Sequence, residues 1–221
     1  MHNILIIGLA LIAFIPNAVI AEDSPTQDED LKVKITRQLG SVDIQHEGKT
    51  LTIMRNQDSN NTINPAFAKT SRNCPPFCIQ PLTLAPGVET IGEQELLEYL
   101  ERVSNGDDSV QVIDSRTKKW VERGTIPGTI NIPYKSLTDN SEENIIDILE
   151  DRFGVTRGSE LLDFSNAKTL VLFCNGLWCG QAPTNIKKLL KLGYPAHKLK
   201  YYRGGMQAWE SLGLTTVIPS K

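Results

Sequence analysis

The sequence predicts an α/β fold with a doubly wound parallel sheet flanked by helices, preceded by a small β-rich N-terminal region. From residue 89 onward, short apolar runs alternate with segments of helical periodicity, and strands separated by helices form parallel sheets. Residues 169–173 are almost entirely apolar, as is typical of a central strand buried on both faces. Before residue 58, by contrast, apolar and polar residues alternate with a period of two, as in a hairpin.

The second half of the chain supplies the predicted sheet and its helices. Strand-like runs cover residues 110–113, 130–133, 169–173 and 198–202, and helical periodicity covers residues 92–103, 118–123, 144–153, 183–192 and 206–212. The helix at 183–192 has a proline in its first turn and Gly193 just past its end, which are typical start and stop signals. We assign residues 88–221 to this α/β domain.

The N-terminal region is predicted to form a hairpin followed by a linker. Residues 31–35, 42–44 and 51–53 alternate like strands, and residues 47–49 form a turn between the last two. The Asn-rich stretch 58–64 is predicted to be a loop, and a Pro-rich connector with two cysteines follows it. We assign residues 22–87 to this N-terminal β-hairpin region and Pro/Cys linker.

The first 21 residues predict a signal peptide. An unbroken apolar run covers residues 4–15, and residues 18–21 supply the small side chains of a cleavage site that ends at Ala21. The run is short for a bilayer span, although the leading three residues contain no Lys or Arg, so an uncleaved anchor is the alternative. We therefore expect a periplasmic protein, exported in a Gram-negative type of cell, that is not integral to the membrane after cleavage.

Composition and charge exclude several classes of partner. The 221 residues carry a formal net charge of −3, and no Lys/Arg-rich stripe appears, so we expect no nucleic-acid partner. The three histidines do not complete a zinc pattern with the four cysteines, so we predict no metal site, and no cofactor is implied.

Cys174 is the predicted catalytic residue, because it stands where the buried strand ends and a loop leads into the next helix. A thiol between a strand end and a helix N-terminus faces backbone amides and the positive end of a dipole, which favours a thiolate and an anion beside it. The predicted anion-cradling loop comprises Asn175, Gly176, Leu177, Trp178, Gly180 and Gln181. Such a thiolate suits attack on a soft anionic sulfur donor, leaving a persulfide on Cys174. The alternative is a small buried core residue.

Four ordered motifs resemble those of rhodanese domains. Residues 112–116 (VIDSR) resemble the D-x-R motif, and residues 124–133 (GTIPGTINIP) resemble G-H-I-P-G-A-x-N-x-P. Residues 172–174 (LFC) resemble the strand that leads into the catalytic cysteine, and residues 202–209 (YRGGMQAW) resemble the closing G-G-x-x-A-W. The resemblance spans residues 88–217 and implies a sulfurtransferase-like fold with a cysteine persulfide intermediate.

The resemblance also assigns roles to two residues beside the predicted site. It implies that Asp114 ties loops together and that Arg116 adds positive potential near the site, both as rim support. The alternative for both is an ion pair at the rim. The chain departs from the family pattern at Thr125, where the family has histidine, and in the loop after Cys174, which lacks the usual basic residue. Recognition of thiosulfate through a loop arginine is therefore in doubt.

Cys179 occupies roughly the place of that missing basic residue. A curled loop brings its own ends together, so Cys179 is a candidate resolving thiol that would attack a persulfide on Cys174 and leave a disulfide. The alternative is that Cys179 only fills space. A phosphatase reading is disfavoured, because it requires arginine six positions after the cysteine and the first arginine after Cys174 is Arg203.

Cys74 and Cys78 form a second close pair in the sequence CPPFC. A structural disulfide is the favoured interpretation, because the N-terminal region has little core of its own and an exported protein meets an oxidising environment. A redox pair serving Cys174 and a metal clip are the alternatives. The segment CPPFCIQP is also similar to segments next to rhodanese domains in other exported bacterial proteins.

The leading functional hypothesis is a sulfurtransferase or persulfide carrier, similar to thiosulfate sulfurtransferases. Its expected partners are a small sulfur-donor anion such as thiosulfate and a periplasmic thiol reductant. A second hypothesis is a thiol–disulfide redox protein that uses Cys174 and Cys179 as a pair. A third is a non-enzymatic module that uses the fold only to bind a partner.

Overall fold

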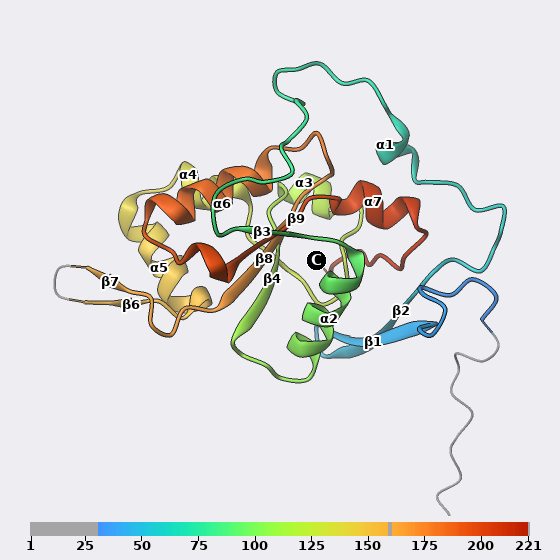
Figure 1. Cartoon of the computed structure of the whole chain (residues 1–221), viewed down its shortest axis with the longest axis horizontal. Helices are drawn as coiled ribbons and strands as arrows, with labels where there is room; N and C mark the ends of the chain where they lie inside the picture. Colours follow the sequence, from blue (N-terminus) through green and yellow to red (C-terminus); the bar gives the residue numbers. More distant parts are fainter. Residues whose placement is uncertain (1–30, 159–160, 221) are drawn as a thin grey trace, which may run out of the picture.

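The computed structural model describes residues 31–158 and 161–220, and it is built around a five-stranded parallel sheet (Figure 1). The strands follow the order β3 (Glu89–Ile91), β9 (Leu199–Tyr202), β8 (Thr169–Phe173), β4 (Val110–Asp114) and β5 (Ile130–Asn131). All four pairings are parallel. The predicted α/β class and parallel sheet are therefore confirmed. The predicted signal peptide lies outside the described residues.

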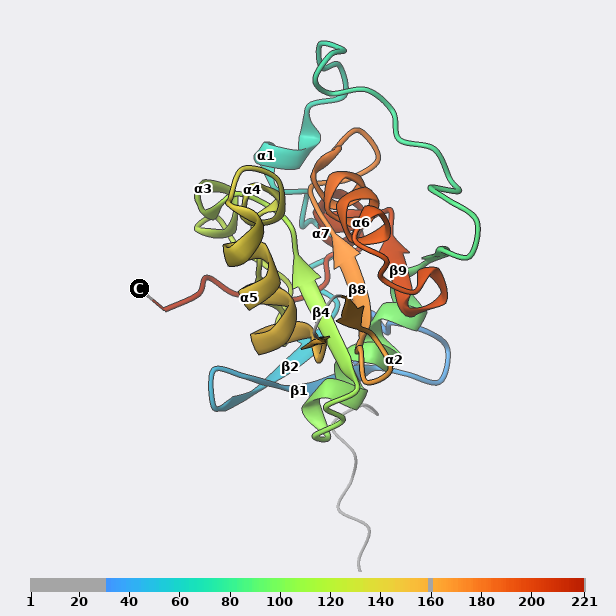
Figure 2. The same ribbon diagram turned by 90° about the vertical axis from the view of Figure 1, so that its left-hand side faces the viewer.

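Helices cover both faces of the sheet, as a doubly wound fold requires (Figure 2). One layer contains α4 (Tyr134–Thr138), α5 (Glu142–Phe153) and α6 (Gln181–Lys191). The other contains α2 (Glu93–Ser104), α3 (Lys118–Val121) and α7 (Gly205–Ser211). Alternate β8 residues serve alternate layers: Leu170 and Leu172 join the first core cluster, and Val171 and Phe173 the second. This two-sided burial explains the continuous apolar sequence of β8.

The predicted N-terminal hairpin forms between β1 (Ser41–His46) and β2 (Lys49–Met54). Its apolar face packs on the α2 side of the sheet, where Val42, Ile44 and Ile53 are buried in the same cluster as the residues of α2. The hairpin thus shares the core of the α/β domain.

The prediction of a strand at residues 31–35 is wrong. The side chain of Gln57 accepts a hydrogen bond from the backbone N–H of Val33 at 3.1 Å and donates one to its carbonyl at 2.9 Å. A single side chain therefore satisfies backbone groups that a neighbouring strand would otherwise bind, and residues 31–35 form bends and irregular backbone instead of a strand.

Several short elements had no clear sequence signal. They are α1 (Pro65–Ala68), the two-stranded ribbon of β6 (Thr156–Arg157) and β7 (Leu162–Asp163), and the 3₁₀ turn Ala196–Lys198. After α1, residues 69–84 form a long connection without helix or strand, which we call the strap. The strap arches past the carboxyl-end edge of the sheet before the chain enters β3 (Figures 1 and 2).

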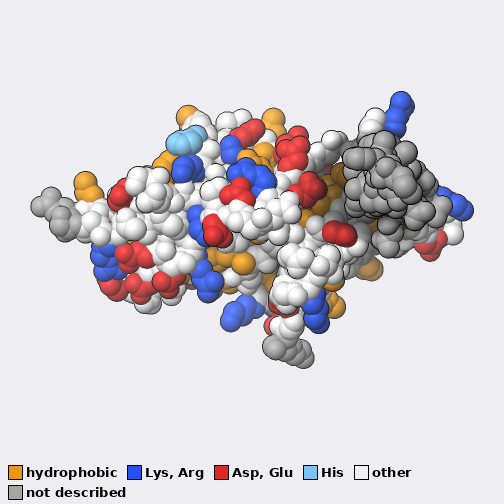
Figure 3. Space-filling view, turned by 90° about the horizontal axis from the view of Figure 1, so that it is seen from below, with side chains coloured by type: hydrophobic (Ala, Val, Ile, Leu, Met, Phe, Trp, Pro, Cys, Tyr) orange, Lys and Arg blue, Asp and Glu red, His pale blue; other side chains and the backbone are white. Residues whose placement is uncertain are grey.

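The described surface has mixed charge. On the face shown in Figure 3, basic and acidic side chains lie interspersed between apolar ones. Across residues 31–158 and 161–220, no helix combines the length and the apolarity needed to cross a membrane.

Candidate active site

Cys174 lies directly after β8, at the carboxyl-end edge of the sheet, and residues 175–180 form the loop that leads into α6. The start of α7 holds this loop: the N–H of Met206 donates to the carbonyl of Cys174, and the N–H of Gln207 donates to the carbonyl of Asn175, each at 3.0 Å. Gly205 permits this close approach, because its φ is +55° and a Cβ there would overlap the Cys174 carbonyl. The glycine pair of the last motif therefore docks α7 against the cysteine loop.

The loop brings Cys174 and Cys179 together as two buried, free thiols. Cys174 is 2% exposed and Cys179 is 4% exposed. Cys174 Sγ donates to the carbonyl of Cys179 at 3.2 Å, and the two thiols are also joined by a side-chain hydrogen bond. The loop thus places Cys174 and Cys179 in direct contact.

Backbone amides of the loop and the first turn of α6 converge on the two sulfurs. Those of Gly176 and Ala182 donate to the sulfur of Cys174, and those of Asn175 and Gln181 donate to the sulfur of Cys179. Convergent amides at a helix N-terminus stabilise negative charge. They therefore form a cradle for a thiolate or a small anion.

The thiolate is favoured at Cys179 rather than at Cys174. Burial raises the pKa of Cys174 well above its usual value, and its hydrogen bond with Cys179 raises it further. Burial also opposes ionisation of Cys179, but the hydrogen bonds from the Cys174 thiol and from backbone amides outweigh it and lower the pKa of Cys179. In this closed arrangement the pKa shifts favour ionisation of Cys179 over ionisation of Cys174, which is the opposite order to the one expected from the sequence.

Asp114 and Arg116 form a buried ion pair with a distance of 2.6 Å between Arg116 Nη2 and Asp114 Oδ2. The same guanidinium nitrogen donates to the carbonyl of Gly124 at 2.7 Å, and the Thr125 hydroxyl donates to Asp114 at 2.7 Å. This network ties the turn after β4 to residues 124–125, and the charge of Arg116 is neutralised within it. The pair therefore supports the rim structurally and does not offer a free positive charge to the cysteine loop.

Tyr201 is a site residue that the sequence reasoning missed. It pairs with Leu172 in the parallel register of β9 and β8, so it shares a sheet face with Leu172 and with Cys174 two residues later. Burial raises the pKa of its hydroxyl above the usual range, and the neighbouring Cys174 and Cys179 raise it further. The hydroxyl is buried and has no hydrogen-bond partner among the residues described. The strand pairing was the signal that could have identified it.

Trp178 anchors the strap to the loop. It is 9% exposed, and its indole N–H donates to Gln207 Oε1 at 3.0 Å. The strap residue Phe77 meets the Trp178 ring edge-on at a centroid distance of 5.6 Å, and the guanidinium of Arg72 lies 3.9 Å from the Trp178 ring centroid. Trp178 therefore packs against the domain and the strap.

Hydrogen bonds to backbone groups hold the strap over the same loop. The N–H of Gln80 donates to the carbonyl of Leu177 at 2.8 Å, and Arg203 Nη2 donates to the carbonyl of Gln80 at 2.8 Å. Within the strap, Cys74 and Cys78 form a disulfide. Arg72 and Arg203 thus place positive charge beside the loop from outside it. The sequence analysis assigned neither arginine to the site, because both are far from Cys174 in sequence.

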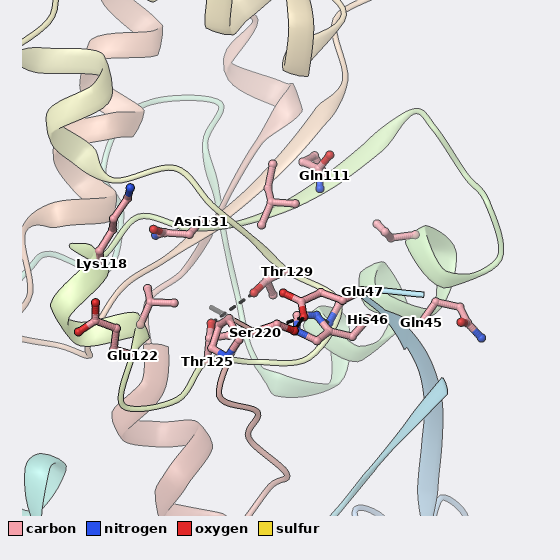
Figure 4. Close-up of a pocket in the computed structure, with 15 residues that line it drawn as sticks. Gln45, His46, Glu47, Gln111, Lys118, Glu122, Thr125, Thr129, Asn131 and Ser220 are labelled. Carbon is pink, nitrogen blue, oxygen red and sulfur yellow. Dashed lines mark hydrogen bonds between the residues drawn. The ribbon is translucent and has the colours of Figure 1, made fainter. Parts of the chain in front are cut away.

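A cavity of about 700 Å³ lies elsewhere in the fold, between the hairpin tip, α3 and the C-terminal tail (Figure 4). His46 lines it, with Nδ1 accepting from the N–H of Gly128 at 3.2 Å. None of the lining residues belongs to the cysteine loop. Within the described part of the chain, no group of three or more His, Cys, Asp or Glu residues could hold a metal ion.

Comparison with known proteins identifies the fold family. The family model described as the rhodanese-like domain matches residues 96–212, which include β4, β8, the cysteine loop and α7. No curated protein matches the chain.

Solved structures with some likeness to this chain come from several organisms. A homologue of single-domain rhodanese and the Cdc25 phosphatase catalytic domain, from Saccharomyces cerevisiae, is 19% identical with a TM-score of 0.42, covering 60% of this chain and 86% of its own. A single-domain sulfurtransferase from the same yeast is 18% identical with a TM-score of 0.37, covering 55% and 88%. An As–Sb reductase from Leishmania major is 25% identical with a TM-score of 0.39, covering 55% and 76%. The family assignment rests on the matched family model.

Proposed function

This chain belongs to the rhodanese-like domain family, and we propose that it moves sulfane sulfur from a small anionic donor through a cysteine persulfide on Cys174. The family includes sulfurtransferases. The observation that carries the proposal is the buried Cys174 thiol, hydrogen-bonded to Cys179 within a cradle of backbone amides. Such a site combines a soft nucleophile, an adjacent base and donors for negative charge.

In the first step, Cys174 attacks the outer sulfur of the donor. The Cys179 thiolate accepts the proton of Cys174 through their hydrogen bond, so Cys174 becomes a nucleophile only as it reacts. A bond forms between Cys174 Sγ and the outer sulfur, and the donor's own sulfur–sulfur bond breaks. With thiosulfate as donor, sulfite leaves with the electron pair of that bond.

In the second step, an acceptor nucleophile takes the outer sulfur from the persulfide and restores the Cys174 thiolate. In the absence of an acceptor, Cys179 loses its proton to solvent and attacks Cys174 Sγ. The outer sulfur then leaves as hydrosulfide, and a disulfide joins Cys174 and Cys179. The site stops working until two electrons reopen that disulfide.

Entry of the donor requires movement in this region. Cys174 is 2% exposed, and the strap covers the loop through Phe77, Arg72 and Gln80. The proposed donor is anionic, and Arg72 and Arg203 supply the positive charge that the loop itself lacks.

A second candidate function is a thiol–disulfide redox protein, and the hydrogen bond between the two buried thiols favours it. A thiosulfate:cyanide assay combined with thiol counting separates the two functions. Sulfur transfer predicts turnover that Cys174→Ser abolishes. A redox protein predicts no turnover and a reversible loss of two thiols on oxidation.

We also propose that the protein acts in the periplasm after cleavage behind Ala21. The disulfide between Cys74 and Cys78 supports this proposal, because such bonds persist in oxidising compartments. N-terminal sequencing of protein from the periplasmic fraction tests it. A retained Met1 in membrane-bound protein would contradict it and indicate an anchor.

A further inference from the structure

The two cysteine pairs differ in how a protein-sized reagent can reach them. Cys174 and Cys179 are 2% and 4% exposed, whereas Cys74 is exposed and Cys78 is half-buried. Thiol–disulfide exchange requires direct attack of one sulfur on another, so a protein dithiol cannot react with a buried pair. The pair on the strap is within reach of such a reagent.

The strap brings Cys78 to the part of the loop that contains Cys179. Phe77, which directly precedes Cys78, packs edge-on against Trp178, which directly precedes Cys179, with ring centroids 5.6 Å apart. The two chain segments are therefore in contact on the N-terminal side of both cysteines.

A second set of contacts lies on the C-terminal side of the same cysteines. Gln80 Nε2 donates to the carbonyl of Cys78 at 2.9 Å and lies 3.7 Å from the position that a Cβ would occupy on Gly180, the residue after Cys179. The Gln80 N–H also donates to Leu177 at 2.8 Å. Cys78 and Cys179 are thus bracketed by contacts between their immediate neighbours, although about a hundred residues separate them.

We propose that Cys74 and Cys78 form a relay that carries electrons from an external protein dithiol to a disulfide between Cys174 and Cys179. In the proposed function, that disulfide forms when Cys179 resolves the persulfide, so the relay explains how a buried site becomes active again. The apolar side chains of Ile79 and Leu82, 81% and 66% exposed, offer a contact surface beside the relay cysteines to the protein that reduces them.

The exchange balances without any further reagent. The external dithiol first reduces the bond between Cys74 and Cys78 and becomes a disulfide itself. Cys78 then attacks Cys179 Sγ, which forms a bond between these two sulfurs and releases Cys174 as a thiolate. Cys74 next attacks Cys78 Sγ, which restores the strap disulfide and releases Cys179 as a thiolate. Two electrons and two protons have then passed from the strap to the loop.

The structure has the arrangement of bonds that this exchange would produce. The strap cysteines are oxidised, and the loop cysteines are free thiols.

The first experiment compares the full chain with the double variant Cys74→Ser/Cys78→Ser. In both proteins the loop disulfide is prepared with diamide rather than with a sulfur donor, so the outcome does not depend on whether the chain transfers sulfur. Each is then treated with reduced thioredoxin as the protein dithiol and, separately, with a small phosphine. Recovery of the loop thiols is followed by alkylation and peptide mapping.

The relay predicts that thioredoxin reopens the loop disulfide at least about tenfold more slowly in the variant, whereas the phosphine reacts with both proteins at rates within about twofold. Equal rates with thioredoxin would overturn the proposal. Equal slowing toward both reagents would also overturn it, because the substitutions would then act through the shape of the loop. Failure of diamide to join Cys174 and Cys179 would leave the relay without a target and would overturn it as well.

A trapping experiment tests which sulfurs meet. The variant Cys74→Ser/Cys174→Ser retains Cys78 and Cys179, and diamide is expected to join them within one chain. The matched variant Cys78→Ser/Cys174→Ser retains Cys74 and Cys179 and is expected to form this link at least about tenfold more slowly. An equal yield in the two variants would contradict the assignment of Cys78 as the attacking residue.

Discussion

The cysteine loop and the strap use the same residue type in opposite surroundings. In the loop, two thiols are buried behind β8, surrounded by backbone amides and joined by a hydrogen bond. In the strap, two cysteines lie at the surface of a segment without helix or strand and are bonded to each other. Burial controls both the ionisation and the accessibility of the loop pair. The strap pair, by contrast, is exposed enough for another protein to reach it. The difference indicates why one pair suits chemistry on a small molecule and the other suits exchange with a protein.

The largest expected effect is a loss of sulfur transfer when the loop pair, but not the strap pair, is changed. Cys174→Ser should lower the rate of sulfur transfer by at least about 1,000-fold, equivalent to about 4 kcal/mol, because serine lacks the soft nucleophile. Thermal unfolding should remain close to that of the wild type, since serine is of similar size. Single-turnover release of sulfite from thiosulfate measures the rate.

The matched control removes the other pair. Cys74→Ser/Cys78→Ser should still take up one sulfur in a single turnover, because Cys174 and Cys179 are intact. Retention of sulfur uptake in Cys174→Ser would show that the nucleophile lies elsewhere.

The next prediction concerns the frame that holds the loop. Asp114→Ala should lower the free energy of unfolding by about 3–5 kcal/mol, because it leaves the charge of Arg116 buried without its partner. Urea denaturation measures this value. The control Asp151→Ala removes an exposed carboxylate and should change stability by less than about 0.5 kcal/mol. A cost below about 1 kcal/mol for Asp114→Ala would contradict the structural role assigned to this pair.

Much of the fold around the cysteine loop could be predicted from the sequence, because local patterns determine it. The apolar run of β8, the hairpin alternation and the ordered motifs each depend on a few neighbouring residues. The place of Cys174 follows from the end of β8, and its closeness to Cys179 follows from a separation of only five positions in the sequence.

Features that depend on distant segments could not be predicted. The contact of Phe77 with Trp178 joins residues about a hundred positions apart, and no local pattern encodes it. The raised pKa of Cys174 depends on how completely the folded chain excludes water from the loop. The strand expected at residues 31–35 failed because Gln57 binds its backbone, which is again a contact made only in the folded chain.

A smaller effect is expected from the strap disulfide. Reducing the bond between Cys74 and Cys78 should lower the free energy of unfolding by about 2 kcal/mol, because so short a closed loop limits few conformations of the unfolded chain. Denaturation of protein with and without reductant measures the change, and the Cys74→Ser/Cys78→Ser variant corrects for any effect on the loop thiols. A loss above about 4 kcal/mol would mean that the strap contributes to the core.

The smallest effect concerns the ionisation of the loop thiols. One thiolate should form below the usual thiol pKa and the second well above it, as followed by ultraviolet thiolate absorbance. Because the pKa of Cys179 is lower in the folded state, its contribution to stability is present above the unfolded pKa and is lost as pH falls through the folded pKa. Cys174→Ala should raise the pKa of Cys179, since it removes the hydrogen bond from the Cys174 thiol. An unchanged titration of Cys179 would contradict the coupling between the two thiols.

The most direct test of sulfur transfer at Cys174 is the intact mass of the full chain after treatment with thiosulfate and removal of excess donor. The account predicts a gain equal to one sulfur atom in the Cys179→Ala variant, where no second thiol can expel it, and peptide mapping should locate that sulfur on Cys174. Wild-type protein should lose two hydrogens instead as its loop disulfide closes. A sulfur atom mapped to Cys74 or Cys78, or no mass change in either protein, would contradict it.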